Sequence, residues 1–195
     1  MKPQAVRIES PGRAAGGLNR ALWKRSPNAH ARPAATVVDL LVAHASPNLR
    51  ATKAWCLDPA ALVSYHDIIS EAGVLYPIVE YDRAAWANGG KGRSAFAGPP
   101  ASDGTNSRSI SFCLVNAQDG RSPIPAVQFE VAAAVAARAC RMLGTIRWIT
   151  EHSRIALPVG RKADIAPAEP TFDLDAFAAR VNFYIGTAAP HVRVA

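Results

Sequence analysis

Cysteines, long apolar runs and acidic residues are all scarce in this chain. Its three cysteines, Cys56, Cys113 and Cys140, lie far apart among 195 residues and form no Cys-x-x-Cys pair. This spacing argues against a disulfide framework and against a cysteine-based metal or redox site. No apolar run reaches the roughly 18 to 20 residues of a membrane span. Proline and glycine interrupt the N-terminus where a secretory signal would need a continuous apolar core. We therefore expect no membrane span, no signal peptide and a cytoplasmic location before any release.

The shortage of acids leaves an excess of positive charge. The chain has 22 lysines and arginines against 15 aspartates and glutamates, a net charge of +7. Much of the excess lies in residues 1–36, where Glu9 is the only acid. Such an arm favours anionic partners, although a solvated tail has the same composition. Nucleic-acid binding is the weaker interpretation, because the aromatic residues of a single-strand groove are not interleaved with the basic ones.

The apolar pattern predicts one α/β domain. The expected strands are 37–43, 63–70, 74–80, 109–116 and 147–150, and the expected helices are 52–61, 125–143 and 173–184. This order implies a central mixed β-sheet flanked by helices. We place the folded domain at residues 37–187, between a partly extended arm (1–36) and a C-terminal tail (188–195). In the helix 125–143 the residues expected to face the core are Val127, Val131, Ala134, Val135 and Met142.

Two histidines, an acid and a lysine stand near the ends of predicted strands. His44 follows the strand 37–43, and His152 follows the strand 147–150. Lys162 and Asp164 come shortly afterwards. Two imidazoles and a carboxylate can ligate a catalytic zinc ion that keeps a fourth position open for water. A histidine after an apolar strand is also often a capped core residue, so the spacing alone leaves both interpretations open.

A wider set of motifs carries a family resemblance. The segments, in chain order, are Leu41 to His44, Val63 to Ile69, Arg83 to Trp86, Asn106 to Asn116, and His152 to Asp164. Together they resemble the zinc-dependent N-acetylmuramoyl-L-alanine amidases of type 2, which include phage endolysins, bacterial recycling amidases and peptidoglycan recognition proteins. The resemblance implies that family's fold over 37–187 and one Zn²⁺ per chain, held by His44, His152 and Asp164. It also implies hydrolysis of the amide between N-acetylmuramic acid and L-alanine in peptidoglycan.

The resemblance gives roles to four further residues. Tyr65 would exchange a proton beside the metal, and Lys162 would stabilise the oxyanion, so both are candidate catalytic residues. Trp86 and Asn106 are candidate substrate-binding residues at the ends of a loop, 87–107, rich in glycine, serine and proline. We expect a lytic, endolysin-like enzyme acting on the cell wall. The alternatives are a peptidoglycan-binding module without activity and a cytoplasmic enzyme that recycles soluble muropeptides.

One departure from the family concerns the general base. Recycling members carry a glutamate where this chain has Cys113, and a buried thiol would replace a carboxylate poorly. The base is then either Tyr65, as in phage members, or absent. His66 should point away from Tyr65 on a regular strand and is expected to be structural. His30 and His191 have no partners nearby in sequence and are expected to be solvated.

Overall fold

A computed structural model describes residues 25–90, 92–96, 104–119, 121–165 and 172–195. The strands are β1 (Ala29–Ala31), β2 (Leu40–Ser46), β3 (Asp67–Ile69), β4 (Leu75–Pro77), β5 (Arg83–Ala85), β6 (Ser109–Val115), β7 (Trp148–Glu151) and β8 (Arg193–Val194). The helices are α1 (Leu49–Leu57), the short 3-10 helix η2 (Pro59–Ala61), α2 (Thr105–Arg108), α3 (Ala126–Leu143), α4 (His152–Ile155) and α5 (Leu174–Ile185).

A six-stranded mixed sheet forms the centre of the molecule, as predicted. Its strand order is β4-β3-β6-β2-β7-β8, in which only the β3–β4 pair is antiparallel. The strands β2 and β6 are buried along their whole length, which explains their nearly continuous apolar sequence. A separate two-stranded antiparallel sheet pairs β1 with β5.

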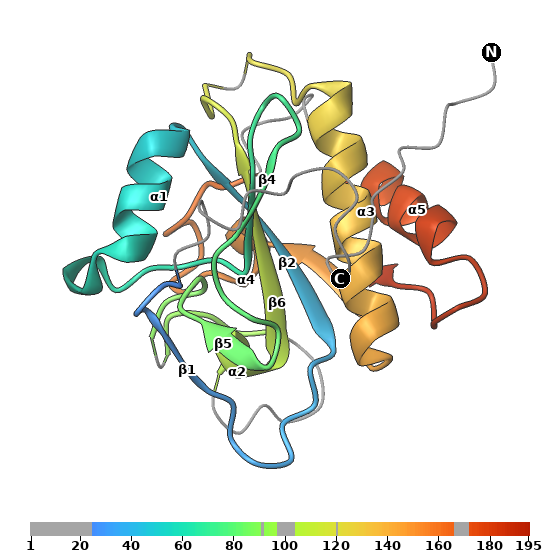
Figure 1. The fold of residues 1–195 in the computed structure, drawn as a ribbon, viewed down its shortest axis with the longest axis horizontal. Helices are drawn as coiled ribbons and strands as arrows, with labels where there is room; N and C mark the ends of the chain where they lie inside the picture. The colour runs from blue at the N-terminus through green and yellow to red at the C-terminus, as the bar shows by residue number, and fades with distance from the viewer. Residues whose placement is uncertain (1–24, 91, 97–103, 120, 166–171) are drawn as a thin grey trace.

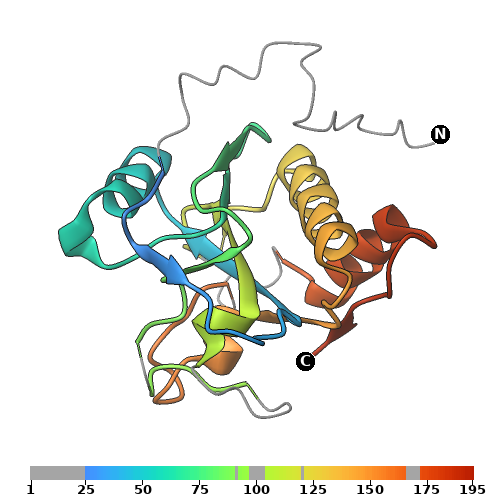
Figure 2. The same ribbon diagram turned by 60° about the horizontal axis from the view of Figure 1, so that its bottom comes forward.

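The two faces of the sheet have different covers. Figures 1 and 2 show α1 on one side of the sheet and α3 with α5 on the other. Along β6, alternate side chains enter different clusters: Phe112 packs in the cluster under α3 and α5, whereas Cys113 packs with Cys56 of α1. On β2, Ala43 lies in the α3 cluster, so the neighbouring His44 faces the side of α1. This face carries the candidate site.

The helix α3 packs through part of the stripe that was predicted. Ala134 and Val135 are buried, as expected, whereas Val127 and Met142 are 47% and 60% exposed, so the prediction was wrong for these two residues. The buried stripe consists mainly of alanines, which lie against Phe177 and Val181 of α5 and against the sheet. Because alanine is abundant on nearly every side of this helix, the apolar period alone could not select the buried face.

Short strands occur in both terminal stretches. The strand β1 pairs with β5 although its sequence lies in the stretch assigned to the basic arm, and β8 adds to the sheet beside β7 from the stretch assigned to the tail. The described parts of both stretches therefore contact the domain. Among the described residues, no helix is long and apolar enough to cross a membrane.

Candidate metal centre

Two buried histidines reach the candidate site from neighbouring parallel strands. His44 lies on β2, and His152 is the first residue of α4, directly after β7. Their exposed fractions are 0% and 3%, and their ring centroids are 4.5 Å apart. Because β2 and β7 are parallel neighbours, their carboxyl ends meet at one edge of the sheet.

Asp164 completes a three-residue cluster. One of its carboxylate oxygens, Oδ2, lies 3.3 Å from His44 Nδ1 and 3.0 Å from His152 Nδ1. One ligand atom from each of the three residues lies within 4.8 Å of the other two. Donors at about 2.0 to 2.2 Å from a tetrahedral zinc ion stand roughly 3.3 to 3.5 Å apart, so both measured separations are close to those of a zinc ligand set.

The electrostatics suit a cation. Burial, followed by repulsion from His152, lowers the pKa of His44 to about 4, so this imidazole is neutral at pH 7. Burial alone would raise the pKa of Asp164, but hydrogen bonds from both histidines hold it well below its usual range. A neutral imidazole and an ionised carboxylate are the protonation states that metal binding requires. The residues present therefore fit a zinc ion.

Tyr65 lies next to this cluster. Its ring centroid is 5.1 Å from that of His44. Burial raises the pKa of Tyr65 well above its usual value, and Cys113 and Asp164 act in the same direction. The phenol therefore keeps its proton at neutral pH, which suits a proton donor better than a general base.

Cys113 lies next to both Tyr65 and His44. It is fully buried, it is the register partner of His44 across β2 and β6, and Tyr65 packs against the apolar cluster to which it belongs. Burial raises the pKa of the Cys113 thiol well above its usual value. A thiol held neutral in this way can serve neither as a general base nor as an anionic ligand.

Lys162 is exposed and lies two residues before Asp164, in the loop after α4. Its charge is close enough to His44 to contribute to the lowered pKa of that histidine. A cation in this position can interact with negative charge that develops near the cluster.

The two candidate substrate residues have well-defined partners within the chain. Trp86 is partly buried, and its Nε1 donates a 2.8 Å hydrogen bond to His30 Nδ1. Asn106 accepts a 2.8 Å hydrogen bond from the backbone N–H of Asn88 and donates a 2.9 Å hydrogen bond to the Gly89 carbonyl. Asn106 thus fastens the start of the loop that follows Trp86.

The three other histidines differ in burial. His66 is buried and accepts a 2.9 Å hydrogen bond from the Ser111 N–H, as expected of a structural residue. Burial, with Arg32 next, lowers its pKa to about 3. His191 is exposed, whereas His30 is half-buried and paired with Trp86, so the prediction that His30 is solvated was wrong.

Sequence reasoning also missed the docking of Arg32. Its guanidinium donates to the carbonyls of Tyr81, Ser107 and Ser109. Burial lowers the pKa of Arg32 to about 10. A basic residue in a stretch rich in proline and alanine looked like part of a solvated arm. The available signal was the alternation of Asn28, His30 and Arg32, which a strand would place on one face.

Comparisons with known proteins place the chain in a family. A family model described as N-acetylmuramoyl-L-alanine amidase matches residues 34–168. The crystal structure of a selenomethionine AmpD derivative is similar over 84% of this chain and 96% of its own, with 26% sequence identity and a TM-score of 0.64. No curated protein matches the chain by sequence.

Two more distant structures share the fold. Drosophila peptidoglycan recognition protein SA has 12% identity and a TM-score of 0.55, covering 87% of this chain and 88% of its own. The N-acetylmuramoyl-L-alanine amidase LysC from Clostridium intestinale has 12% identity and a TM-score of 0.51, covering 75% and 87%. The family model spans more than half of the chain. The chain therefore belongs to the N-acetylmuramoyl-L-alanine amidase family.

Proposed function

We propose that the protein is a zinc-dependent enzyme that hydrolyses the amide between N-acetylmuramic acid and L-alanine in peptidoglycan. The observation that carries the proposal is the convergence of His44, His152 and Asp164, with one carboxylate oxygen 3.3 Å and 3.0 Å from the two Nδ1 atoms. These three side chains would hold one zinc ion. When bound, zinc acts as a Lewis acid that activates water for attack on a carbonyl.

The chain's own residues supply the remaining steps. Lys162 stabilises the negative charge that develops on the carbonyl oxygen as the amide is attacked. Tyr65, protonated at neutral pH, gives a proton to the leaving amine of L-alanine and regains one from the attacking water, so that the phenol is restored. Cys113 stays neutral and packs near the phenol. No step then requires a carboxylate at the Cys113 position.

Substrate binding falls to the residues around the loop 87–107. Trp86 offers an aromatic face to a sugar ring or to the stem peptide, and Asn106 sets the path of the chain that follows Trp86. The net charge of +7 draws the protein towards an anionic wall, an effect that weakens as salt rises.

We further propose that the polymeric wall is the substrate, as in an endolysin. The pairing of Tyr65 with an uncharged residue at the Cys113 position supports this form of the proposal, because no carboxylate then stands where recycling members carry their glutamate base. The neutral thiol is also the feature that favours the second candidate, a module that binds peptidoglycan without cutting it. The two candidates differ in whether any amide is cleaved.

The test compares polymeric peptidoglycan with a soluble N-acetylmuramoyl peptide. We expect the wild type to release new L-alanine N-termini from the polymer, detected by labelling and mass spectrometry. His44→Ala should abolish release, whereas the matched variant His191→Ala should keep it. Wall binding by the wild type without release would identify a recognition module, and preference for the soluble peptide would identify a recycling enzyme.

A further inference from the structure

The segment 25–32, here called the strap, crosses the domain next to the proposed substrate wall. Arg25 pairs with Glu80 at 2.6 Å, and the backbone of β1 pairs with β5, the strand directly before Trp86. Figure 1 shows β1 beside β5 on the side of the sheet that faces α1 and α4. The polar side chains of Asn28, His30 and Arg32 each bind a different part of the surrounding chain.

The strap holds the backbone of Trp86 through Ser64. The Trp86 N–H donates a 3.0 Å hydrogen bond to Ser64 Oγ, and this hydroxyl donates a 2.5 Å hydrogen bond to the Asn28 carbonyl. Ser64 directly precedes Tyr65, so the same contact fixes the chain that carries the phenol. Asn28 is 1% exposed, and its side-chain amide donates hydrogen bonds of 2.8 Å and 3.0 Å to the carbonyls of Asp58 and Val63.

The strap holds the indole of Trp86 through His30. The indole N–H donates a 2.8 Å hydrogen bond to His30 Nδ1, which requires that nitrogen to be unprotonated. The proton of the neutral ring then sits on Nε2, which lies 3.4 Å from Ser107 Oγ and can donate to it. The imidazole therefore links Trp86 to α2, the short helix directly before β6, in one orientation.

Trp86 is consequently fixed at both its main chain and its ring by the same short segment. An indole with only its backbone fixed would still rotate about its side-chain bonds. A ring that must meet a substrate loses less conformational freedom on binding if it is held beforehand.

We propose that His30 is a positioning residue that holds Trp86 in the orientation that binds the glycan or stem peptide. The inference rests on the proposed function, because Trp86 is the substrate wall only if peptidoglycan is the substrate. His30 touches none of the reacting groups, so its contribution lies in substrate binding and leaves the chemical step unchanged.

The experiment measures kcat and KM of the metal-loaded full chain on a soluble N-acetylmuramoyl peptide. Loss of one neutral hydrogen bond in His30→Ala should raise KM by about 3- to 10-fold with kcat unchanged. His30→Asn should restore KM, because Asn Oδ1 can take the place of His Nδ1 as the acceptor. His30→Gln offers its oxygen nearer the position of Nε2 and should not restore it.

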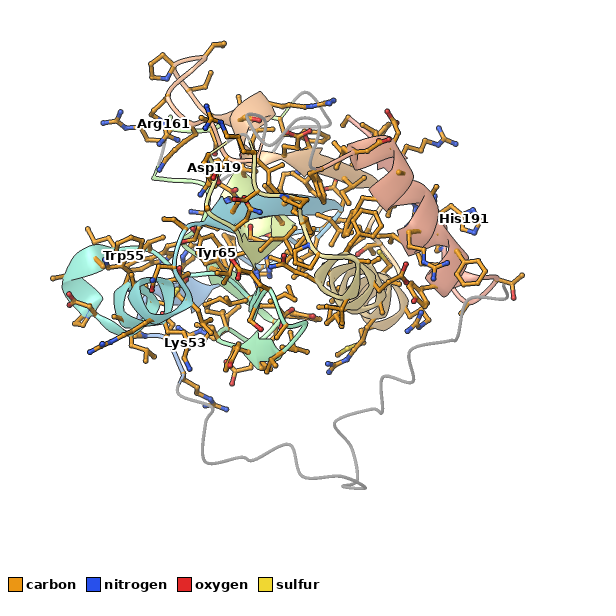
Figure 3. The ribbon with its side chains drawn as sticks, turned by 90° about the horizontal axis from the view of Figure 1, so that it is seen from above. Lys53, Trp55, Tyr65, Asp119, Arg161 and His191 are labelled. Atoms are coloured by element: carbon orange, nitrogen blue, oxygen red, sulfur yellow. The ribbon has the colours of Figure 1, made fainter. Side chains whose placement is uncertain are left out.

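The matched control is His191→Ala. His191 also lies in a terminal stretch and hydrogen-bonds to a backbone carbonyl, that of Gly186, but it lies across the molecule from Tyr65 (Figure 3). This variant should leave KM and kcat unchanged. In a Trp86→Phe background, His30→Ala should have no further effect on KM. An undiminished effect in that background, or an unchanged KM in His30→Ala, would overturn the proposal.

A second readout does not depend on activity. The chain has four tryptophans, and the indole N–H resonance of Trp86 is the one lost in Trp86→Phe. We expect this resonance to move in His30→Ala and to return towards its original position in His30→Asn. An unmoved resonance means that His30 does not hold the indole. If the wild type cleaves no amide while the resonance moves, the proposed function fails and the contact stands.

Discussion

Replacing Asp67 with asparagine should stabilise the protein at neutral pH. Asp67 lies on β3, is 3% exposed, and accepts a 2.6 Å hydrogen bond from the Tyr81 hydroxyl. Burial raises the pKa of Asp67 from 3.8 to about 6, against the opposing effects of Tyr81 and Arg138. The folded chain therefore binds more protons than the unfolded chain between about pH 4 and pH 6. Its free energy of unfolding falls as pH rises through this window, and the loss is complete above pH 6.

The pKa difference sets the magnitude. A rise in the pKa of Asp67 from 3.8 to about 6 lowers the free energy of unfolding at pH 7 by about 3 kcal/mol. Asparagine carries no charge and still offers Tyr81 an acceptor. Asp67→Asn should thus be more stable than wild type by up to about 3 kcal/mol at pH 7, with the advantage shrinking towards zero near pH 4.

Urea unfolding at pH 4, 5, 6, 7 and 8, followed by circular dichroism, measures this difference. Any pH dependence that comes from the metal site is common to both proteins and cancels in the comparison. Asp119→Asn is the control: backbone N–H groups of Ser122 and Arg121 lower the pKa of Asp119 to about 2, so its effect should be flat over this range. The reasoning is refuted if the wild type is more stable than Asp67→Asn at pH 7, or if the difference in their free energies of unfolding does not change with pH.

Three further predictions concern the site and its support. Lys162→Met should lower kcat by about 10²-fold with little change in KM, since a cation near the oxyanion acts mainly in the transition state; an equal loss in the exposed control Arg121→Met would contradict this role. Cys113→Ser should keep kcat close to wild type in steady-state assays because the buried thiol is neutral, and a loss as large as that of Lys162→Met would make Cys113 a participant. Arg108→Met should lower the free energy of unfolding by about 3 to 5 kcal/mol in urea titrations, because it leaves the Asp39 carboxylate without its Arg108 partner; a cost below about 1 kcal/mol would contradict it.

The sheet could be predicted because its central strands have unambiguous patterns. The segments that became β2 and β6 are mostly apolar, as is typical of parallel strands that are buried on both faces. The buried face of α3 could be predicted only in part, because its many alanines fit either side: Val135 was placed correctly and Met142 was not. The strand β1 was missed because three residues beside prolines carry too little periodicity, and its docking depends on partners such as Trp86 and Ser107 far along the chain.

The candidate site, too, could be predicted only in part from the sequence. His44, His152 and Asp164 were proposed as one set because of a family resemblance, and the spacing alone left a structural role open for each histidine. The two histidines converge because β2 pairs in parallel with β7, and no local pattern encodes this pairing. The protonation states of Tyr65 and Cys113 depend on burial, which the sequence does not show at single positions.

The most direct test of the account is metal content measured together with amide cleavage. Purified wild type should hold about one zinc ion per chain and release L-alanine N-termini from peptidoglycan. A chelator should remove the metal and the activity together, and added zinc should restore both. Asp164→Ala should lose zinc, whereas Asp173→Ala, which removes only the N-cap of α5, should keep it. A protein that binds no zinc, or cleavage that continues after the metal has been removed, would contradict the central claim.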